Sequence, residues 1–225
     1  MIWLIECIYC NNFVYHLSDG RVKCSVCHKK TSKKRINKIL NLIEIYVSNV
    51  SALEASKRVG ISYVSVQKYY KDFRILSATI CEREYEQLRE KNCEYEEYMY
   101  QENSKKNKDD VIFDAHNFLT FDYDGHIYTI LMPSLQRYKK QFLEDNLDKN
   151  YIKEFKKFQR DYKIIKVSKH LNNIVKFWDY FEKEILKYKG VNYNSFIYFL
   201  KEFEFKYNHK KDEAIDLIVK EYFKE

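Results

Sequence analysis

Apolar residues first recur at helical spacing a short way into the chain. Between residues 36 and 47 apolar residues recur every three or four positions, with one adjacent pair, at Ile36, Ile39, Leu40, Ile43 and Val47. This period places them on one face of an α-helix. We therefore predict an amphipathic helix here, with its apolar face turned toward a core.

Two more helices are predicted directly after it. Ser51 can cap the first of these, Glu54 three residues later completes a capping box, and Gly60 ends the helix. Apolar and aromatic residues resume after the glycine and predict a third helix over residues 63–73. A short helix, a turn that contains glycine and another helix form the pattern of a helix-turn-helix.

Residue types that favour β-structure return further along the chain. Residues 94–100 predict one strand, and residues 117–121 and 126–132 predict a hairpin around Asp124-Gly125 that ends at Pro133. The other predicted helices and one short apolar run cover residues 82–90, 135–142, 151–162, 164–167, 174–188, 195–207 and 212–223. Helices and antiparallel strands in separate stretches indicate an α+β chain.

The four N-terminal cysteines surround another predicted hairpin. Strand-favouring residues 13–17 and 21–23 lie on either side of the turn Asp19-Gly20, and a Cys-x-x-Cys pair stands at each end of this segment. Four thiolates on two opposed turns can surround one ion tetrahedrally, which is the geometry that structural zinc prefers. The ligands of this predicted zinc ribbon, over residues 1–34, are Cys7, Cys10, Cys24 and Cys27.

An alternative for the second pair is haem attachment, because Cys24-Ser-Val-Cys27-His28 also has that pattern. That chemistry needs an exported chain. The apolar start, residues 2–8, has no basic segment before it and is too short for a signal peptide or a membrane span. We therefore expect a cytoplasmic protein, with no membrane association, in which Cys81 and Cys93 are reduced and His28 is not a ligand.

Positive charge is concentrated in the first third of the chain. Residues 1–75 contain thirteen Lys and Arg against five Asp and Glu, whereas the remainder is close to neutral. A basic segment beside a zinc ribbon favours a polyanion, and double-stranded DNA is the expected partner. Residues 35–78 are then a DNA-binding domain. The cationic segment at residues 29–35 would contact phosphates through Lys33, Lys34 and Arg35.

Within the third helix, four polar residues are candidates for DNA contacts. Ser65 and Gln67 could contact base edges in a major groove, and Lys68 and Lys71 suit phosphates. The alternative is a three-helix packing unit without DNA binding, since glycine between helices is common.

Five segments carry a likeness to a known family. They are residues 94–100 (EYEEYMY), 118–133, 170–178 (HLNNIVKFW), 188–191 (YKGV) and 200–209 (LKEFEFKYNH). In this order they resemble landmarks of the ISXO-type insertion-sequence transposases, which combine a zinc ribbon, a helix-turn-helix and a DDE recombinase core. The last two segments resemble the family's C-terminal signature, which is the most specific part of the likeness.

The resemblance implies a reduced ribonuclease-H-like α/β core with a helical C-terminus over residues 79–225. In that family three acidic residues hold two divalent ions, here expected to be Mg²⁺ or Mn²⁺, at a scissile phosphate. Glu96 matches the first acid, and Asp145 matches the second, with Asp148 as an alternative. The third position holds Val175, which cannot bind a metal.

Glu182 is the candidate for a migrated third acid. It lies seven residues after Val175, on the same face of the predicted helix and about 10 Å away. The alternative is that Glu182 is one charge on a solvated helix. Asn172 or Asn173 could also offer a neutral oxygen ligand.

Two functions stay open. The chain is expected to be a transposase-like protein that recognises element ends and has a divergent strand-transfer core. Because Val175 replaces an acid, the alternative is a catalytically inactive DNA-binding regulator derived from a transposase. The sequence leaves undecided whether the protein is an enzyme. A homo-oligomer could form on the DNA, and in a bacterium the protein would associate with the nucleoid.

Overall fold

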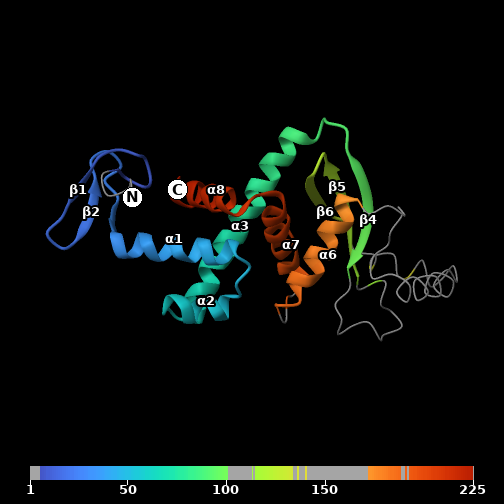
Figure 1. Cartoon of the computed structure of the whole chain (residues 1–225), viewed down its shortest axis with the longest axis horizontal. Helices are drawn as coiled ribbons and strands as arrows, with labels where there is room; N and C mark the ends of the chain where they lie inside the picture. Colours follow the sequence, from blue (N-terminus) through green and yellow to red (C-terminus); the bar gives the residue numbers. More distant parts are fainter. Residues whose placement is uncertain are drawn as a thin grey trace. The chain divides into compact units, whose positions relative to one another are not determined.

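The computed structural model describes residues 6–100, 113, 115–133, 136, 140, 172–188, 191 and 193–224 (Figure 1). This part of the chain is α+β, as predicted, with helices and two three-stranded antiparallel sheets. The strands are β1 (Val14–His16), β2 (Arg21–Cys24), β3 (Lys30–Ser32), β4 (Glu94–Tyr100), β5 (His116–Tyr123) and β6 (His126–Leu131). The helices are α1 (Lys33–Val47), α2 (Ala52–Val59), α3 (Tyr63–Leu88), α6 (Asn173–Ile185), α7 (Tyr193–Asn208) and α8 (Lys211–Lys224).

The chain divides into two compact units. The terminal unit contains Met1–Glu84 and Leu186–Glu225, and the central unit contains Tyr85–Ile185. The expected boundary between residues 78 and 79 lies inside α3, and α7 and α8 belong to the same unit as the N-terminal helices. Apart from residues 136 and 140, the elements expected at 135–142, 151–162 and 164–167 lie outside the described residues, as do Asp145 and Asp148.

The N-terminal sheet has the strand order β1-β2-β3, with all neighbours antiparallel. The predicted turn joins β1 and β2: Gly20 adopts φ +75°, and the Asp19 carboxylate accepts a hydrogen bond from the Arg21 backbone N–H. A left-handed φ of this kind favours glycine because other residues place a Cβ against the backbone. β3 was not predicted. It forms part of the cationic segment at residues 29–35 and leads directly into α1.

Local capping interactions set the bounds of the first two helices. The Ser32 hydroxyl accepts a hydrogen bond from the Arg35 N–H at the start of α1, and the Ser51 hydroxyl accepts one from the Glu54 N–H at the start of α2. Gly60 ends α2 in the left-handed conformation, with φ +67°. The Glu54 carboxylate accepts a hydrogen bond from the Arg58 side chain, one turn further along α2.

The third helix is much longer than predicted. The pattern indicated residues 63–73, whereas α3 continues to Leu88. Buried positions recur at helical spacing beyond Phe73, at Ser77, Ile80 and Cys81, and the segment contains neither glycine nor proline. The predicted acidic helix at 82–90 is therefore the last part of α3 and not a separate element.

One core holds the terminal unit together. Tyr46 from α1, Tyr70 and Phe73 from α3, Phe205 from α7 and Ile218 from α8 are all fully buried in a single cluster. Figure 1 shows α8 lying alongside α1, and the two helices are in contact. The C-terminal helices thus complete the core of the predicted DNA-binding segment.

The central unit is built on the sheet β4-β5-β6, against which α6 packs. Tyr98 of β4 stacks on Trp178 of α6 with ring centroids 3.6 Å apart. The Trp178 indole N–H donates to the Thr120 hydroxyl over 3.1 Å, so these two buried polar groups satisfy one another. The predicted strand at 94–100 and the hairpin after it are confirmed.

Candidate metal centre and nucleic-acid-binding segment

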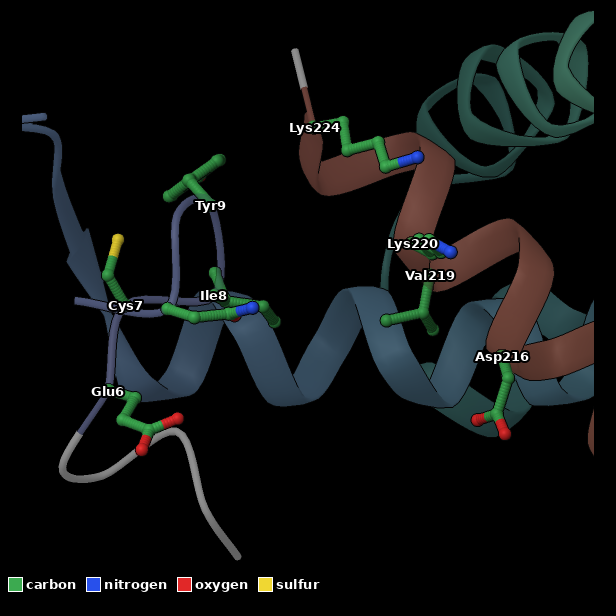
Figure 2. Close-up of a pocket in the computed structure, with 9 residues that line it drawn as sticks. Glu6, Cys7, Ile8, Tyr9, Asp216, Val219, Lys220 and Lys224 are labelled. Atoms are coloured by element: carbon green, nitrogen blue, oxygen red, sulfur yellow. The ribbon is translucent and has the colours of Figure 1, made fainter.

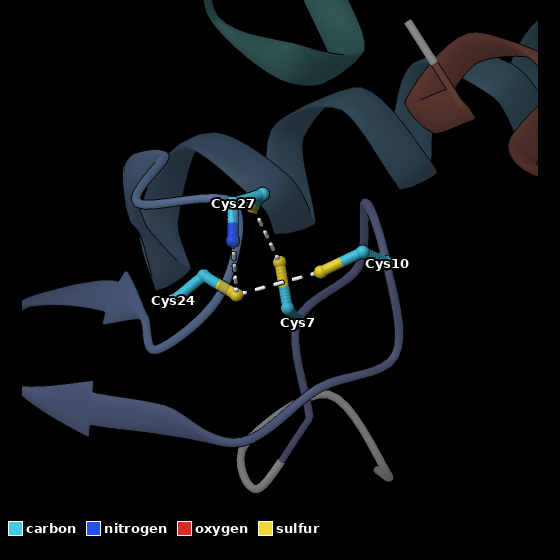
Figure 3. A group of neighbouring side chains, drawn as sticks. All are labelled: Cys7, Cys10, Cys24 and Cys27. Carbon is cyan, nitrogen blue, oxygen red and sulfur yellow. Dashed lines mark hydrogen bonds between the residues drawn. The ribbon is translucent and has the colours of Figure 1, made fainter.

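Four sulfur atoms converge at the N-terminal sheet, as Figure 3 shows. The Sγ atoms of Cys7, Cys10, Cys24 and Cys27 all lie within 4.8 Å of one another. Across the cluster, Cys7 and Cys27 are 3.7 Å apart and Cys10 and Cys24 are 3.4 Å apart. A tetrahedral site with metal–sulfur bonds of about 2.3 Å has sulfur–sulfur distances of about 3.8 Å. The four cysteines can therefore hold a metal ion.

The two Cys-x-x-Cys pairs have matching backbone conformations. The residue after each second cysteine, Asn11 or His28, has a left-handed φ of 57°. The backbone N–H groups of Val26 and Cys27 point at the Cys24 sulfur over 3.3 and 3.4 Å. Hydrogen bonds to sulfur stabilise a thiolate, so this loop favours the form of Cys24 that binds a metal ion. His28 is exposed and adopts this left-handed conformation.

The thiols differ in how readily they ionise. Burial raises the pKa of Cys7 to about 12, whereas hydrogen bonding with Asn12 lowers the pKa of Cys10 to about 6. Four thiolates at these distances repel one another, so ionisation of all four needs a cation between them. Because the cluster includes all four cysteines, it favours metal binding over haem attachment at one pair alone.

A cavity of about 370 Å³ lies beside the first cysteine loop, between that loop and α8 (Figure 2). Its lining includes Glu6 and Asp216 as well as Lys220 and Lys224, so its charges favour no one class of ligand. Next to it, the Tyr9 ring meets Phe223 of α8 edge to face, with centroids 5.6 Å apart. This contact attaches the cysteine loop to the helical core.

The first turn of α1 carries three exposed cations, Lys33, Lys34 and Arg35, and no acidic residue. Unpaired backbone N–H groups make the N-terminus of a helix electropositive, so cations there oppose the helix dipole. This arrangement is unfavourable for the isolated helix and favourable for an anion. It is therefore suited to a phosphate group.

The start of α3 presents most of the residues predicted to contact DNA. Gln67, Lys68 and Lys71 are exposed, and the Gln67 amide donates to the Tyr63 hydroxyl over 2.9 Å. Ser65 is half-buried, and its hydroxyl is hydrogen-bonded to that of Ser62 at 2.8 Å. Val64, an apolar residue in the same stretch of α3, is 60% exposed. An apolar side chain among polar groups could be found only once the packing of α3 was known.

The predicted catalytic residues are placed separately. Glu96 of β4 is buried, and its carboxylate accepts a hydrogen bond of 2.6 Å from the Asn172 amide. Asn172 also caps α6, since its side-chain oxygen accepts from the Val175 N–H. Glu182, near the other end of α6, accepts a hydrogen bond of 2.6 Å from the Tyr98 hydroxyl.

The structure does not bring Glu96 and Glu182 to one point. Asn172 and Glu182 are ten residues apart, which corresponds to about 15 Å along a helix. Among the described residues, the four cysteines are the only group of three or more His, Cys, Asp or Glu placed to share a metal ion. Asp145 lies outside those residues, so the catalytic assignment stays a prediction. Val175 is fully buried in the core of the layer.

No α-helix in the part of the chain that the structure describes is both long enough and apolar enough to cross a membrane. Family models, curated proteins and solved structures were each compared with the chain, and none of them matches it.

Proposed function

We propose that this protein binds double-stranded DNA through a zinc ribbon and a helix-turn-helix in its terminal unit. The observation that carries the proposal is the run of three exposed cations in the first turn of α1, immediately after the cysteine cluster. Cations at this end of a helix weaken the helix unless an anion is bound, and the phosphates of DNA supply that anion.

Zinc is the metal that suits the cluster. Four thiolates at tetrahedral spacing form a closed, all-sulfur site, which is typical of structural zinc and leaves no open position for catalysis. A small three-stranded sheet buries little apolar surface by itself, so the metal would supply much of its stability. Zinc would thereby hold β3 and the start of α1 in place.

The segment from α2 to α3 supports the second DNA contact. α2 is short, Gly60 makes the turn, and the exposed face at the start of α3 carries Gln67, Lys68 and Lys71. In a helix-turn-helix the second helix enters the major groove with its N-terminal residues at the base edges. We assign Gln67 to bases and the two lysines to phosphates.

The test measures affinity of the zinc-loaded full chain for duplex DNA as a function of salt. Lys68→Ala should weaken binding to all sequences and reduce the salt slope by about 0.9, the value for one phosphate contact on a duplex. A triple change of Lys33, Lys34 and Arg35 to Gln should reduce it further. Lys183→Ala, at an exposed lysine of α6, is the matched control. Equal effects of Lys68→Ala and the control would contradict the proposal.

Zinc dependence is tested separately. We expect zinc in the wild type and its loss in a Cys24→Ser, Cys27→Ser double variant, because two ligands cannot hold the ion. That variant should also lose affinity for duplex DNA. Unchanged zinc content in it would refute the ribbon assignment.

A second candidate function is strand transfer by a divergent ISXO-type transposase core. The observation in its favour is Glu96, a buried carboxylate held by Asn172 at the start of α6. We expect weak or absent cleavage with Mg²⁺ or Mn²⁺, because Val175 replaces an acid that would offset the metal charge. Absence of cleavage would favour the alternative of a DNA-binding regulator derived from a transposase.

Cleavage of end-containing DNA by the wild type, Glu96→Gln and Glu182→Gln decides between these functions. Robust cleavage that only Glu96→Gln abolishes would remove Glu182 from the site. Cleavage that neither change affects would remove the whole DDE assignment. Assembly as a homo-oligomer on DNA, and a cytoplasmic location at a bacterial nucleoid, belong to the same proposal.

A further inference from the structure

The outer face of the N-terminal sheet carries two large exposed aromatic side chains. Phe13 and Tyr15 are each 56% exposed, and their rings meet edge to face with centroids 5.2 Å apart. They stand two residues apart in an extended segment, so they share one face. The residue between them, Val14, is buried with the cysteines on the opposite face. The two rings are thus not part of the core that holds the sheet together.

Lysines continue this face across all three strands. Tyr15 of β1 pairs with Lys23 of β2, and Lys23 pairs with Lys30 of β3. Side chains of directly paired residues in antiparallel strands lie on the same face, about 5 Å apart. We call Phe13, Tyr15, Lys23 and Lys30 the aromatic-lysine face.

The two lysines are placed at a cost to the fold. Like charges directly opposite one another destabilise a pair of strands. Asp19, at the nearby turn, is already engaged by Arg21 through its side chain. Within the described residues, no ion pair includes Lys23 or Lys30. The Asp19 carboxylate also attracts Lys30, and a phosphate at this row would offset the repulsion that remains.

We propose that the aromatic-lysine face binds single-stranded DNA, with Phe13 and Tyr15 stacking on unpaired bases and Lys23 and Lys30 contacting the phosphates. Only an unpaired, unstacked base can present its ring face to an aromatic side chain. Proteins that bind single strands combine such stacking with basic residues that contact the phosphates. A purely apolar partner would gain nothing from the paired lysines. The inference rests on the proposed function for its choice of DNA, but uses residues separate from α1 and α3.

The experiment uses the zinc-loaded full chain and three probes: oligothymidylate, oligouridylate and a blunt duplex. A double variant, Phe13→Leu with Tyr15→Leu, keeps apolar side chains but removes the rings. It should bind oligothymidylate at least about tenfold more weakly, because stacking is lost, and should bind the duplex as the wild type does. A Phe13→Tyr, Tyr15→Phe variant should keep wild-type affinity. Leu53→Ala, at an exposed apolar residue of α2, is the surface control.

A second pair of changes tests the lysines without touching the rings. Lys23→Gln with Lys30→Gln should reduce the salt slope for oligothymidylate by about 1.4, the value for two phosphate contacts on a single strand. Zinc content and circular dichroism establish that each variant is folded. If the leucine variant loses zinc, the lysine variant alone decides the result.

The outcomes separate this inference from the proposed function. A wild type that binds neither oligothymidylate nor the duplex overturns both. If the wild type binds the duplex, and the leucine and lysine variants bind oligothymidylate as tightly as the wild type does, only the inference is overturned. Tighter binding of oligouridylate than of oligothymidylate would overturn the choice of DNA as the single-stranded ligand. The chain could instead self-associate through this face. Self-association would then persist in the leucine variant and be lost in a Phe13→Ala, Tyr15→Ala variant. That result would identify the face as an interface between copies and overturn the inference.

Discussion

Arg74 of α3 and Glu202 of α7 form an ion pair, 2.6 Å long, inside the terminal unit. The Glu202 side chain is fully buried and that of Arg74 is 12% exposed. Lys206 donates to the second oxygen of the same carboxylate, and its ammonium group lies over the Tyr46 ring of α1. The buried carboxylate therefore joins α7 to α3, the helix that carries the proposed base contacts, and Lys206 extends this network to α1.

Removal of this carboxylate should be strongly destabilising. Glu202→Leu leaves two buried cations without their partner, and we expect a loss of about 3–5 kcal/mol in the free energy of unfolding. Glu86→Leu removes an exposed carboxylate paired with Arg89 and should cost no more than about 1 kcal/mol. Urea denaturation of both variants measures the difference. Similar midpoints for the two would mean that the buried pair does not hold α7 in place.

The C-terminal helix should be needed for the fold of the proposed DNA-binding segment. Ile218 of α8 is fully buried in the cluster that contains Tyr46 and Phe73. Ile218→Ala should therefore lower the free energy of unfolding by about 2–5 kcal/mol, through lost burial and the cavity left behind. The exposed Asp216→Ala is the control on the same helix. A fragment of residues 1–75 should for the same reason be poorly folded, and its dispersion in an NMR spectrum checks this.

The left-handed residue after Cys27 gives a prediction about backbone conformation. His28→Gly should keep zinc content and stability, because glycine adopts φ 57° without strain. His28→Val should lower stability by about 1–2 kcal/mol, since a β-branched residue is strained there. Thermal unfolding and metal analysis test both variants. Loss of zinc from His28→Gly would instead identify the imidazole as a ligand.

The pH dependence of stability should have a component from His209. Its Nδ1 faces the Phe205 carbonyl and its Nε2 faces the Glu84 carboxylate, each at 2.8 Å. Both partners accept, so both ring nitrogens donate only in the protonated form. Burial opposes this charge, but the contacts with Glu84 and Phe205, together with the charge of Glu213, raise the pKa of His209 above 6.5.

A group whose pKa is raised by folding contributes its full stabilisation below its unfolded-state pKa. This contribution disappears as pH rises through its folded-state pKa. The stability difference between wild type and His209→Gln should therefore be largest below about pH 6.5 and shrink at alkaline pH. Urea denaturation across this range measures it. A difference that grows with pH would show that the neutral imidazole is the form bound in the fold.

Several features of this protein follow from local sequence alone. The spacing of Cys7, Cys10, Cys24 and Cys27 predicted the cluster that the structure contains, because each pair needs only its own short turn. The caps at Ser51 and Gly60 and the turn at Asp19-Gly20 were likewise predicted correctly. In each case the interaction that decides the conformation lies within a few residues along the chain.

Other features could be decided only by the tertiary structure. Helical spacing showed that α3 and α7 each have an apolar face, but the period of a helix does not specify what covers that face. The partner of Arg74 lies 128 residues away, and Val64 is exposed although it is apolar. The same holds for Glu96, whose burial and pairing with Asn172 depend on the packing of α6 against a sheet. The cost of burying a charge is set by groups that come together only when the chain folds, and therefore local sequence cannot show which charges are buried.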